Sequence, residues 1–308
     1  MTLFALKVIN SCYTCKMKKE IAINRTKITN DLMHYIYDNI DSDINLDALS
    51  EDFHISKFHM HRIFKQEFGF NIYETIKSIR LQKASNLLIT NKKSTISEIS
   101  SVCGYGSQTS FIRAFSARFG MSPKRWRKGG FIEYSNKILS TLPDALRSDA
   151  DYSTLSPVIK KLPAFEVYYI RHLGYDAGIK ECWQKLQTFV LSSDIQSYSQ
   201  IALYHDNPII TPLKECSYVA CIRIEDKVKP PKINLPSFKI ETGVYAEFSA
   251  KGHNDDILKL IQWVYHEWLP KSGFETTTKP SCVIYEENNF LNEEGFFSLK
   301  YYIPIVLA

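Results

Sequence analysis

A helical pattern that occurs twice constrains this chain more than any other feature. The first copy spans residues 49–69 and the second spans residues 99–120. From Ser56 and Ser107 onward the two copies align at a constant offset, with matching arginines, phenylalanines and a final glycine. Each copy combines a short helix, a turn and a second helix with an apolar stripe. Two helix-turn-helix units in one segment predict a protein that reads two stretches of DNA groove.

Charge is unevenly distributed along the 308 residues. Residues 1–130 hold 20 Lys and Arg against 11 Asp and Glu, whereas residues 131–308 hold 18 against 22. A basic first half beside an acidic second half predicts a polyanion-binding module joined to a different one.

The remaining composition excludes several classes of protein. Seven scattered cysteines, an odd number, favour reduced thiols in a cytoplasm over a disulfide framework. The pair Cys12 and Cys15 has no second pair at metal-binding spacing, so neither a metal nor a cofactor is expected. No uncharged apolar run reaches eighteen residues, which argues against a membrane span.

Residues 22–130 are expected to form an all-α domain of seven helices. Helix starts are marked by the capping residues Asn45, Ser56, Asn71, Thr95, Ser107 and Ser122. The helix between the two units should have about 18 residues, or roughly 27 Å at 1.5 Å per residue. That length is on the scale needed to set two recognition helices one DNA turn, roughly 34 Å, apart.

The outward face of each second helix carries groups that suit DNA. Arginine fits guanine, glutamine fits adenine and apolar groups meet thymine methyls, while helix N-termini and basic side chains hold phosphates. The predicted DNA contacts are Ser56, Lys57, Phe58, His61, Arg62, Gln66, Ser107, Gln108, Thr109, Ile112, Arg113, Lys124 and Arg125. The alternative, an ordinary solvated face of a helical bundle, is disfavoured by the repeated spacing, the caps and the basic excess.

These motifs resemble a known family. The run Gly104-Tyr-Gly-Ser-Gln108 and the later Phe119-Gly-Met-Ser-Pro123 follow the signature of the AraC/XylS family of transcription regulators. The resemblance covers residues 26–130 and is closest to the Rob-like activators of stress and multidrug-resistance genes.

The resemblance implies base-reading roles for particular residues. In the first unit these are Phe58, His61 and Arg62; in the second they are Gln108, Thr109 and Arg113. The chain departs from the family at His54, where glycine is usual, and at Phe58 and His61, where tryptophan and glutamine are usual. The first unit is therefore expected to read a different DNA sequence.

Beyond the helical domain the character of the chain changes. Residues 1–21 are expected to be an N-terminal leader, with Met17 as an alternative start, and residues 131–157 to be an irregular linker. Residues 158–308 alternate β-rich segments with two helices, and the segments that begin at 165 and 243 resemble each other. The predicted fold class is α + (α+β): an all-α double helix-turn-helix domain followed by a duplicated β-α-β-β domain of SHS2 type.

Pairing of the two β-α-β-β units should leave an aromatic groove between the helices and the sheet. The residues predicted to bind an effector there are Tyr169, Trp183, Tyr204, Tyr218, Trp263, Glu267, Trp268 and Tyr285. Such a groove suits a lipophilic or cationic small molecule, although aromatic side chains that only fill a core are the alternative for each position.

This half resembles the gyrase-inhibitor-like effector-binding domains through the segments 162–174, 267–270 and 302–305. The family often places a buried glutamate two residues before a late tyrosine. Here that position is Val283 before Tyr285, so cation recognition of that kind is in doubt, and Glu267 or Glu286 are the alternatives.

Together these features and the two resemblances predict a cytoplasmic, non-enzymatic transcription regulator, an activator of stress or multidrug-resistance genes that binds an asymmetric DNA site as a monomer. Its expected partners are double-stranded DNA, RNA polymerase and a small lipophilic effector, with no membrane. Two other functions stay open for the second domain: hydrolysis of a small electrophile, and a protein-interaction role that inhibits gyrase.

Overall fold

The computed structural model describes residues 25–140, 149–225, 233–254 and 256–308. The chain divides into two compact units, one that ends at Ser78 and one that begins at Ile79. None of the described helices is long and apolar enough to cross a bilayer. The predicted leader and the pair Cys12 and Cys15 lie outside the described residues.

The first unit is helical. Residues 25–38 form a helix, followed by α2 (Leu46–Asp52) and α3 (Lys57–Phe68), and α4 (Ile72–Thr90) begins here. Its helices begin where the sequence predicts, because the Asn45 side chain accepts hydrogen bonds from Asp47 N and Ala48 N, and the Asn71 carboxamide accepts one from Glu74 N.

The helical part of the second unit continues from α4. Its elements are α5 (Ile96–Val102), α6 (Gln108–Phe119), α7 (Pro123–Arg125), a π-helical turn η1 (Trp126–Gly130) and α8 (Phe131–Leu139). Trp126 is fully buried, packs against Phe115 and Phe119, and donates through Nε1 to Ser85 O at 3.0 Å. One indole thus ties α4, α6 and the chain after α7 together.

The prediction of an irregular linker was wrong for its first part. Residues 131–139 form α8 rather than coil, because Tyr134, Ile138 and Leu139 lie on one face of a helix. Tyr134 contacts Trp126, with ring centroids 5.2 Å apart. The helix has only nine residues and is stabilised by this tertiary packing, which the sequence alone does not reveal.

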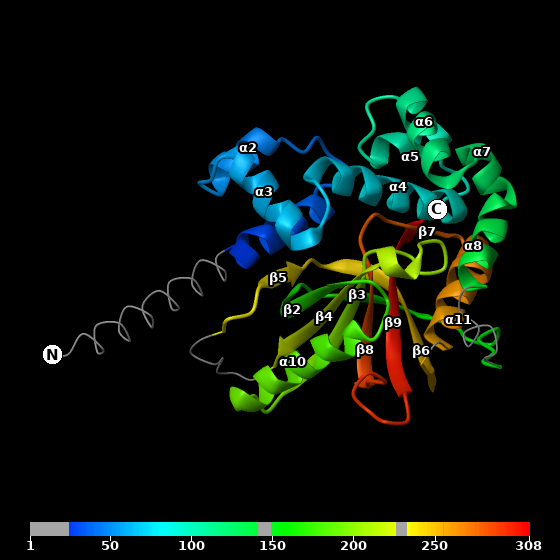
Figure 1. Cartoon of the computed structure of the whole chain (residues 1–308). Coiled ribbons are helices and arrows are strands. Elements are labelled where there is room, and N and C mark those ends of the chain that lie inside the picture. The colour runs from blue at the N-terminus through cyan, green and yellow to red at the C-terminus, as the bar shows by residue number, and fades with distance from the viewer. Residues whose placement is uncertain (1–24, 141–148, 226–232, 255) are drawn as a thin grey trace. The chain divides into compact units, whose positions relative to one another are not determined.

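The second unit also contains a curled antiparallel sheet of nine strands (Figure 1). The strands are β1 (Val158–Leu162), β2 (Phe165–Leu173), β3 (Tyr198–Tyr204), β4 (Ser217–Ile224), β5 (Ser237–Ile240), β6 (Gly243–His253), β7 (Phe274–Thr276), β8 (Ser281–Glu287) and β9 (Phe296–Leu307). The helices are α10 (Gly178–Ser192) and α11 (Asp256–Trp263), with the short turns η2 (Leu213–Glu215), η3 (Val264–Trp268) and η4 (Leu269–Lys271).

The strand order is β1-β6-β9-β8-β3-β4-β2-β5, with β7 added to β9. The element order β2-α10-β3-β4 differs from β6-α11-β7-β8-β9 by the short strand β7, and the two sets of strands meet where β3 pairs with β8. The six strands predicted from the sequence are confirmed, whereas β1, β5 and β7 were not predicted.

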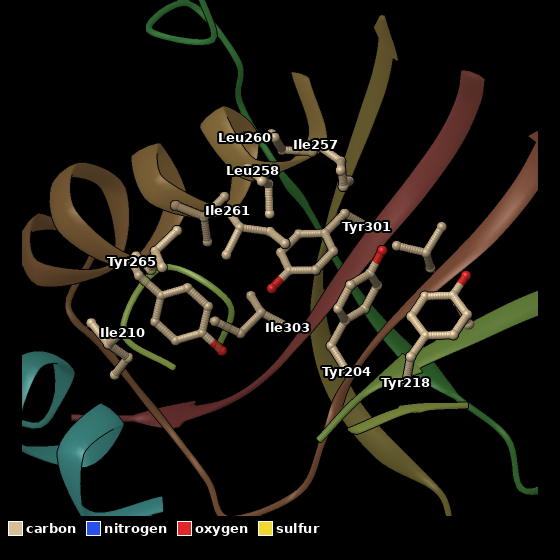
Figure 2. Close-up of a cluster of buried hydrophobic side chains, with 14 of the residues drawn as sticks. Tyr204, Ile210, Tyr218, Ile257, Leu258, Leu260, Ile261, Tyr265, Tyr301 and Ile303 are labelled. Carbon is tan, nitrogen blue, oxygen red and sulfur yellow. The ribbon is translucent and has the colours of Figure 1, made fainter. Parts of the chain in front are cut away.

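The two faces of the sheet hold different hydrophobic clusters. One cluster joins α10 and α11 to alternate residues of the strands, including Ala202, Tyr204 and Val283. Figure 2 shows side chains of α11 directed toward Tyr301 of β9, with Tyr204 and Tyr218 beyond it. The intervening residues of the strands, such as Tyr169 and Leu203, form a second cluster on the opposite face. The period of two along each strand produces this separation.

Candidate nucleic-acid interface and effector groove

The turn of the first helix-turn-helix unit contains a strained residue. His54 has φ 53°, in the left-handed region that glycine adopts without cost. The turn ends at Ser56, whose hydroxyl caps α3 by accepting from His59 N at 3.2 Å. The departure from glycine noted in the sequence thus falls on a residue that does adopt the left-handed conformation.

The outward face of α3 presents one large apolar group. Met60, Ile63 and Phe64 are buried, while Phe58 is 78% exposed. An exposed phenyl ring at the start of a recognition helix is suited to apolar contact with a thymine methyl. It has no hydrogen-bonding capacity of its own.

Several polar side chains of this face form hydrogen bonds or ion pairs within the protein. Lys57 Nζ lies 2.8 Å from Asp47 Oδ1, and Gln66 Oε1 accepts a long bond of 3.4 Å from Arg25 Nη1. Exposed Arg62 places Nη2 3.0 Å from His59 Nδ1. Arg62 is therefore the exposed arginine of this face, and its guanidinium lies beside the imidazole of His59.

His61 is half-buried and stacks on Tyr73, with ring centroids 5.5 Å apart. Burial, and after it the charge of Lys57, lower the pKa of His61 below its usual value. The imidazole is therefore neutral at physiological pH and offers one donor and one acceptor to a base edge.

The second helix-turn-helix unit has more regular local structure. Thr95 and Glu98 form a capping box at α5, and Gly104 has φ 73° in the turn. Ser107 caps α6 by accepting from Ser110 N at 3.2 Å. Phe111, Phe115 and Phe119 bury one stripe of α6.

The predicted contact residues of α6 lie on its opposite face. Gln108, Thr109 and Arg113 are exposed, and Ile112 is half-buried beside them. An amide, a hydroxyl, a methyl-bearing side chain and a guanidinium are thus grouped on the first turns of one helix. This combination can read donor and acceptor patterns in a major groove.

A shallow basic depression follows α6. Ser122, Lys124, Arg125, Lys128 and Glu133 line it, at the start of α7. Arg125 Nη2 lies 3.6 Å from Glu133 Oε2, while Lys124 is exposed. Such a surface suits a phosphate of the DNA backbone rather than a base.

Four of the eight predicted effector residues are brought together beneath α10. Trp183 Nε1 donates to the hydroxyl of Tyr218 at 3.1 Å, and the hydroxyls of Tyr218 and Tyr285 lie 3.3 Å apart. The rings of Tyr204 and Tyr218 meet edge to face at 5.5 Å. Burial raises the pKa of Tyr285 to about 12, so its hydroxyl is neutral. All four are at most 8% exposed, and we call them the aromatic groove, the name of the groove predicted from the sequence.

The other four predicted residues lie elsewhere. Trp263 and Trp268 pack around Phe248 of β6, at 5.8 and 4.9 Å between ring centroids. Tyr169 belongs to the cluster on the opposite face of the sheet, because alternate residues of β2 point to opposite faces. Glu267 has a 57% exposed side chain that is paired with Lys271 at 2.6 Å.

The charge of the aromatic groove follows from Val283. Val283 is fully buried in β8, opposite Ala202 of β3, on the helix-covered face. The alternative Glu286 is 53% exposed and paired with Lys300. The position that carries a carboxylate in the resembling family is therefore apolar, and neither proposed substitute reaches the groove.

Two residues of the groove were missed. Tyr175 lies 6.2 Å from Tyr218 and 6.4 Å from Phe290 between ring centroids, and Phe290 lies 6.0 Å from Tyr218. Both are half-buried, so they lie between these buried side chains and the surface. They come from loops after β2 and β8, where no period marks a residue as inward-facing.

The fold defines the class of the protein: a chain with two helix-turn-helix units and an α+β domain built on an antiparallel sheet. A family model described as a helix-turn-helix domain matches residues 49–129, and one described as a GyrI-like small molecule binding domain matches residues 155–306. The chain thus combines a region similar to helix-turn-helix domains with a region similar to GyrI-like small molecule binding domains.

Two known relatives match about a third of this chain. The Xylose operon regulatory protein of Escherichia coli K12 is 36% identical over 95 residues, which are 31% of this chain and 24% of that protein. The transcriptional activator RhaS of Escherichia coli strain SE11 is 30% identical over 112 residues, 36% of this chain and 40% of that protein. The chain therefore spans less than half the length of these relatives.

Among solved structures, the electron cryo-microscopy structure of an EcmrR–DNA complex aligns with 85% of this chain and 99% of that one, at 14% identity and a TM-score of 0.42.

Proposed function

We propose that the protein is a ligand-responsive transcription activator that binds an asymmetric DNA site as a monomer in the cytoplasm. The exposed polar faces of the capped helices α3 and α6 carry this proposal. Because α4 has 19 residues, it spans roughly 28 Å at 1.5 Å per residue. That length suits two recognition helices in successive major grooves on one side of the duplex.

We propose that α6 reads bases through Gln108, Thr109, Ile112 and Arg113, and α3 through Phe58, His61 and Arg62. Ser56, Lys57, Gln66, Ser107, Lys124 and Arg125 contact the backbone and fix the register. This assignment rests on exposure and on the resemblance. RNA polymerase is the proposed protein partner, and stress or multidrug-resistance genes are the proposed targets.

The effector domain binds its ligand in the aromatic groove. Its buried, neutral tyrosine hydroxyls and the apolar Val283 favour a neutral, aromatic or lipophilic molecule that offers one or two hydrogen-bonding groups. The similar element orders β2-α10-β3-β4 and β6-α11-β7-β8-β9 support an origin of this domain, residues 158–308, by duplication. Residues 22–130 are the proposed DNA-binding domain.

We favour binding over hydrolysis in this domain. The matching family is described by small-molecule binding, and the buried position where a carboxylate would act is Val283. An inhibitory contact with gyrase has no specific support in the residues described above.

Arg113→Ala tests the DNA-reading assignment. Loss of a bidentate contact should cost about 1–3 kcal/mol at one base pair and relax the preference at that position. Lys124→Ala is the matched control, since loss of a phosphate contact weakens specific and random DNA equally. Binding selections with randomised DNA distinguish the two patterns, and an Arg113→Ala profile like that of Lys124→Ala would contradict the assignment.

A further inference from the structure

The loop that joins β3 to β4 is unusual because it is buried. Loops normally run over the surface, yet every residue from 205 to 211 is buried. Ile209, Ile210 and Thr211 have no exposed surface. The loop lies within the unit that begins at Ile79, so its contacts belong to one compact body.

The two ends of this loop are residues of the aromatic groove. Tyr204 is the last residue of β3, Tyr218 is the second residue of β4, and the two are paired in register. Their rings are in edge-to-face contact at 5.5 Å. A ligand that moves either ring therefore acts directly on an end of the loop.

The middle of the loop is hydrogen-bonded to the helix that precedes the second helix-turn-helix unit. Asn207 Nδ2 donates to Asn86 Oδ1 at 2.9 Å, and Thr211 Oγ1 donates to Gln82 Oε1 at 3.0 Å. Thr211 and Gln82 are both buried. Since a buried polar group that loses its partner destabilises the fold, these contacts favour one defined position of α4.

The last part of the loop reaches the recognition helix itself. Glu215, in η2, forms an ion pair with Arg118 in the final turn of α6. Apolar contacts accompany the polar ones, because Leu88, Phe111 and Ile210 belong to one hydrophobic cluster. The same twelve-residue connection, 205–216, thus contacts the groove, α4 and α6.

We propose that the β3–β4 loop, residues 205–216, transmits occupancy of the aromatic groove to α4 and α6 and so sets the DNA affinity of the second helix-turn-helix unit. This rests on the proposed function, in which the groove binds the effector. Asn207 and Thr211 are positioning residues that act through Asn86 and Gln82.

Amide hydrogen exchange on the full chain tests this inference without DNA or ligand. Tyr204→Leu perturbs the groove, and Tyr169→Leu, a buried tyrosine on the opposite face of the same sheet, is the control. Tyr204→Leu should speed exchange in residues 79–95 about threefold or more, whereas Tyr169→Leu leaves these amides unchanged. Equal effects of the two variants would overturn the proposal.

The same measurement in a second background isolates the loop. With Asn207→Ala and Thr211→Val present, Tyr204→Leu should still alter exchange in β3, β4 and β8 but no longer in residues 79–95. Transmission that persists without these two contacts contradicts a route through the loop.

A DNA-binding cycle keeps the proposal testable if Tyr204→Leu does not fold. Asn207→Ala and Asn86→Ala should each weaken binding to a specific site about threefold to tenfold, and the double variant should lose little more than either one. Losses that multiply would show that the two residues act independently. If no sequence-specific binding is found for the unaltered chain, the proposed function fails, while the exchange result still decides the role of the loop.

Discussion

At the scale of single residues, backbone conformation in the two turns separates the two helix-turn-helix units. His54 and Gly104 both adopt positive φ, at 53° and 73°. A side chain in the left-handed region costs about 1–2 kcal/mol, and glycine avoids this cost. The first turn therefore stores strain that the second does not.

His54→Gly is expected to stabilise the first helix-turn-helix unit. Relief of the left-handed strain, partly offset by the greater freedom of glycine in the unfolded chain, should add about 0.5–1 kcal/mol to the free energy of unfolding. Urea unfolding followed by circular dichroism at 222 nm measures the change. Destabilisation would instead reveal a contact of the imidazole that outweighs its backbone strain.

Gly104→Ala should destabilise the second helix-turn-helix unit. An added Cβ would lie 2.6 Å from Arg80 Nε and 2.6 Å from Nη2, and the residue also has positive φ. We expect a loss of about 1–3 kcal/mol. Gly106→Ala is the matched control in the same turn, because a Cβ there meets nothing within 4 Å. Similar losses at both positions would show that the close approach of Arg80 is unimportant.

At the scale of elements, local rules predicted helix starts well. The hydroxyls of Ser56, Ser107 and Ser122 each accept a backbone hydrogen bond at the start of a helix. These caps depend on three or four neighbouring residues, so the sequence contains all the information needed.

Elements stabilised by distant partners were harder to predict. β7 has three residues and exists because it pairs with Ile305, Val306 and Leu307 of β9. Helix α8 was missed because Trp126, its packing partner, belongs to another element. The effector residues were grouped without regard to the face of the sheet, since the sequence does not say which alternate residues of each strand face the helices. Tyr169 of β2 and Tyr204 of β3 therefore could not be separated.

The β3–β4 loop contains a carboxylate whose titration should be measurable. Asp206 is buried and accepts a hydrogen bond from Ser217 N at 2.8 Å. Burial raises the pKa of Asp206 to about 6, although Ser217, Lys83, Arg171 and Arg118 oppose this shift. In the unfolded chain the group has its ordinary pKa near 3.9. Between about pH 4 and 6 the folded chain retains a proton that the unfolded chain loses, so stability falls as pH rises through this window.

Asp206→Asn should remove this pH dependence. The amide oxygen can still accept from Ser217 N, while the cost of a buried charge at neutral pH disappears, so stability at pH 7.5 should rise by about 1–3 kcal/mol. Near pH 4 the variant and the unaltered chain should be alike. Tryptophan fluorescence in urea at several pH values measures both. Glu286→Gln, at an exposed carboxylate with a lowered pKa, serves as the control and should leave the slope between pH 4 and 6 in place.

At the scale of the whole molecule, the boundary between compact units does not coincide with the boundary between the two functions. The second helix-turn-helix unit shares a hydrophobic cluster with the effector sheet, through residues such as Leu88, Trp126 and Ile210. The first unit ends at Ser78, within α4. A shared core makes cooperative unfolding of residues 79–308 the expected behaviour, with the DNA-reading helix α6 included.

The distribution of tryptophan allows this division to be tested directly. All four tryptophans, at positions 126, 183, 263 and 268, lie beyond Ser78, so fluorescence reports only the second unit, whereas circular dichroism reports the helices of both. We expect one cooperative fluorescence transition and a dichroism curve that resolves a second midpoint.

His54→Gly should shift that second midpoint alone, because His54 lies in the first unit. Conversely, Asp206→Asn should shift the fluorescence transition and the matching dichroism midpoint, and leave the second midpoint unchanged. Identical midpoints for both signals in every variant would show that the chain unfolds as one cooperative body, and a fluorescence curve with two steps would show that α6 and the effector sheet do not share a cooperative core.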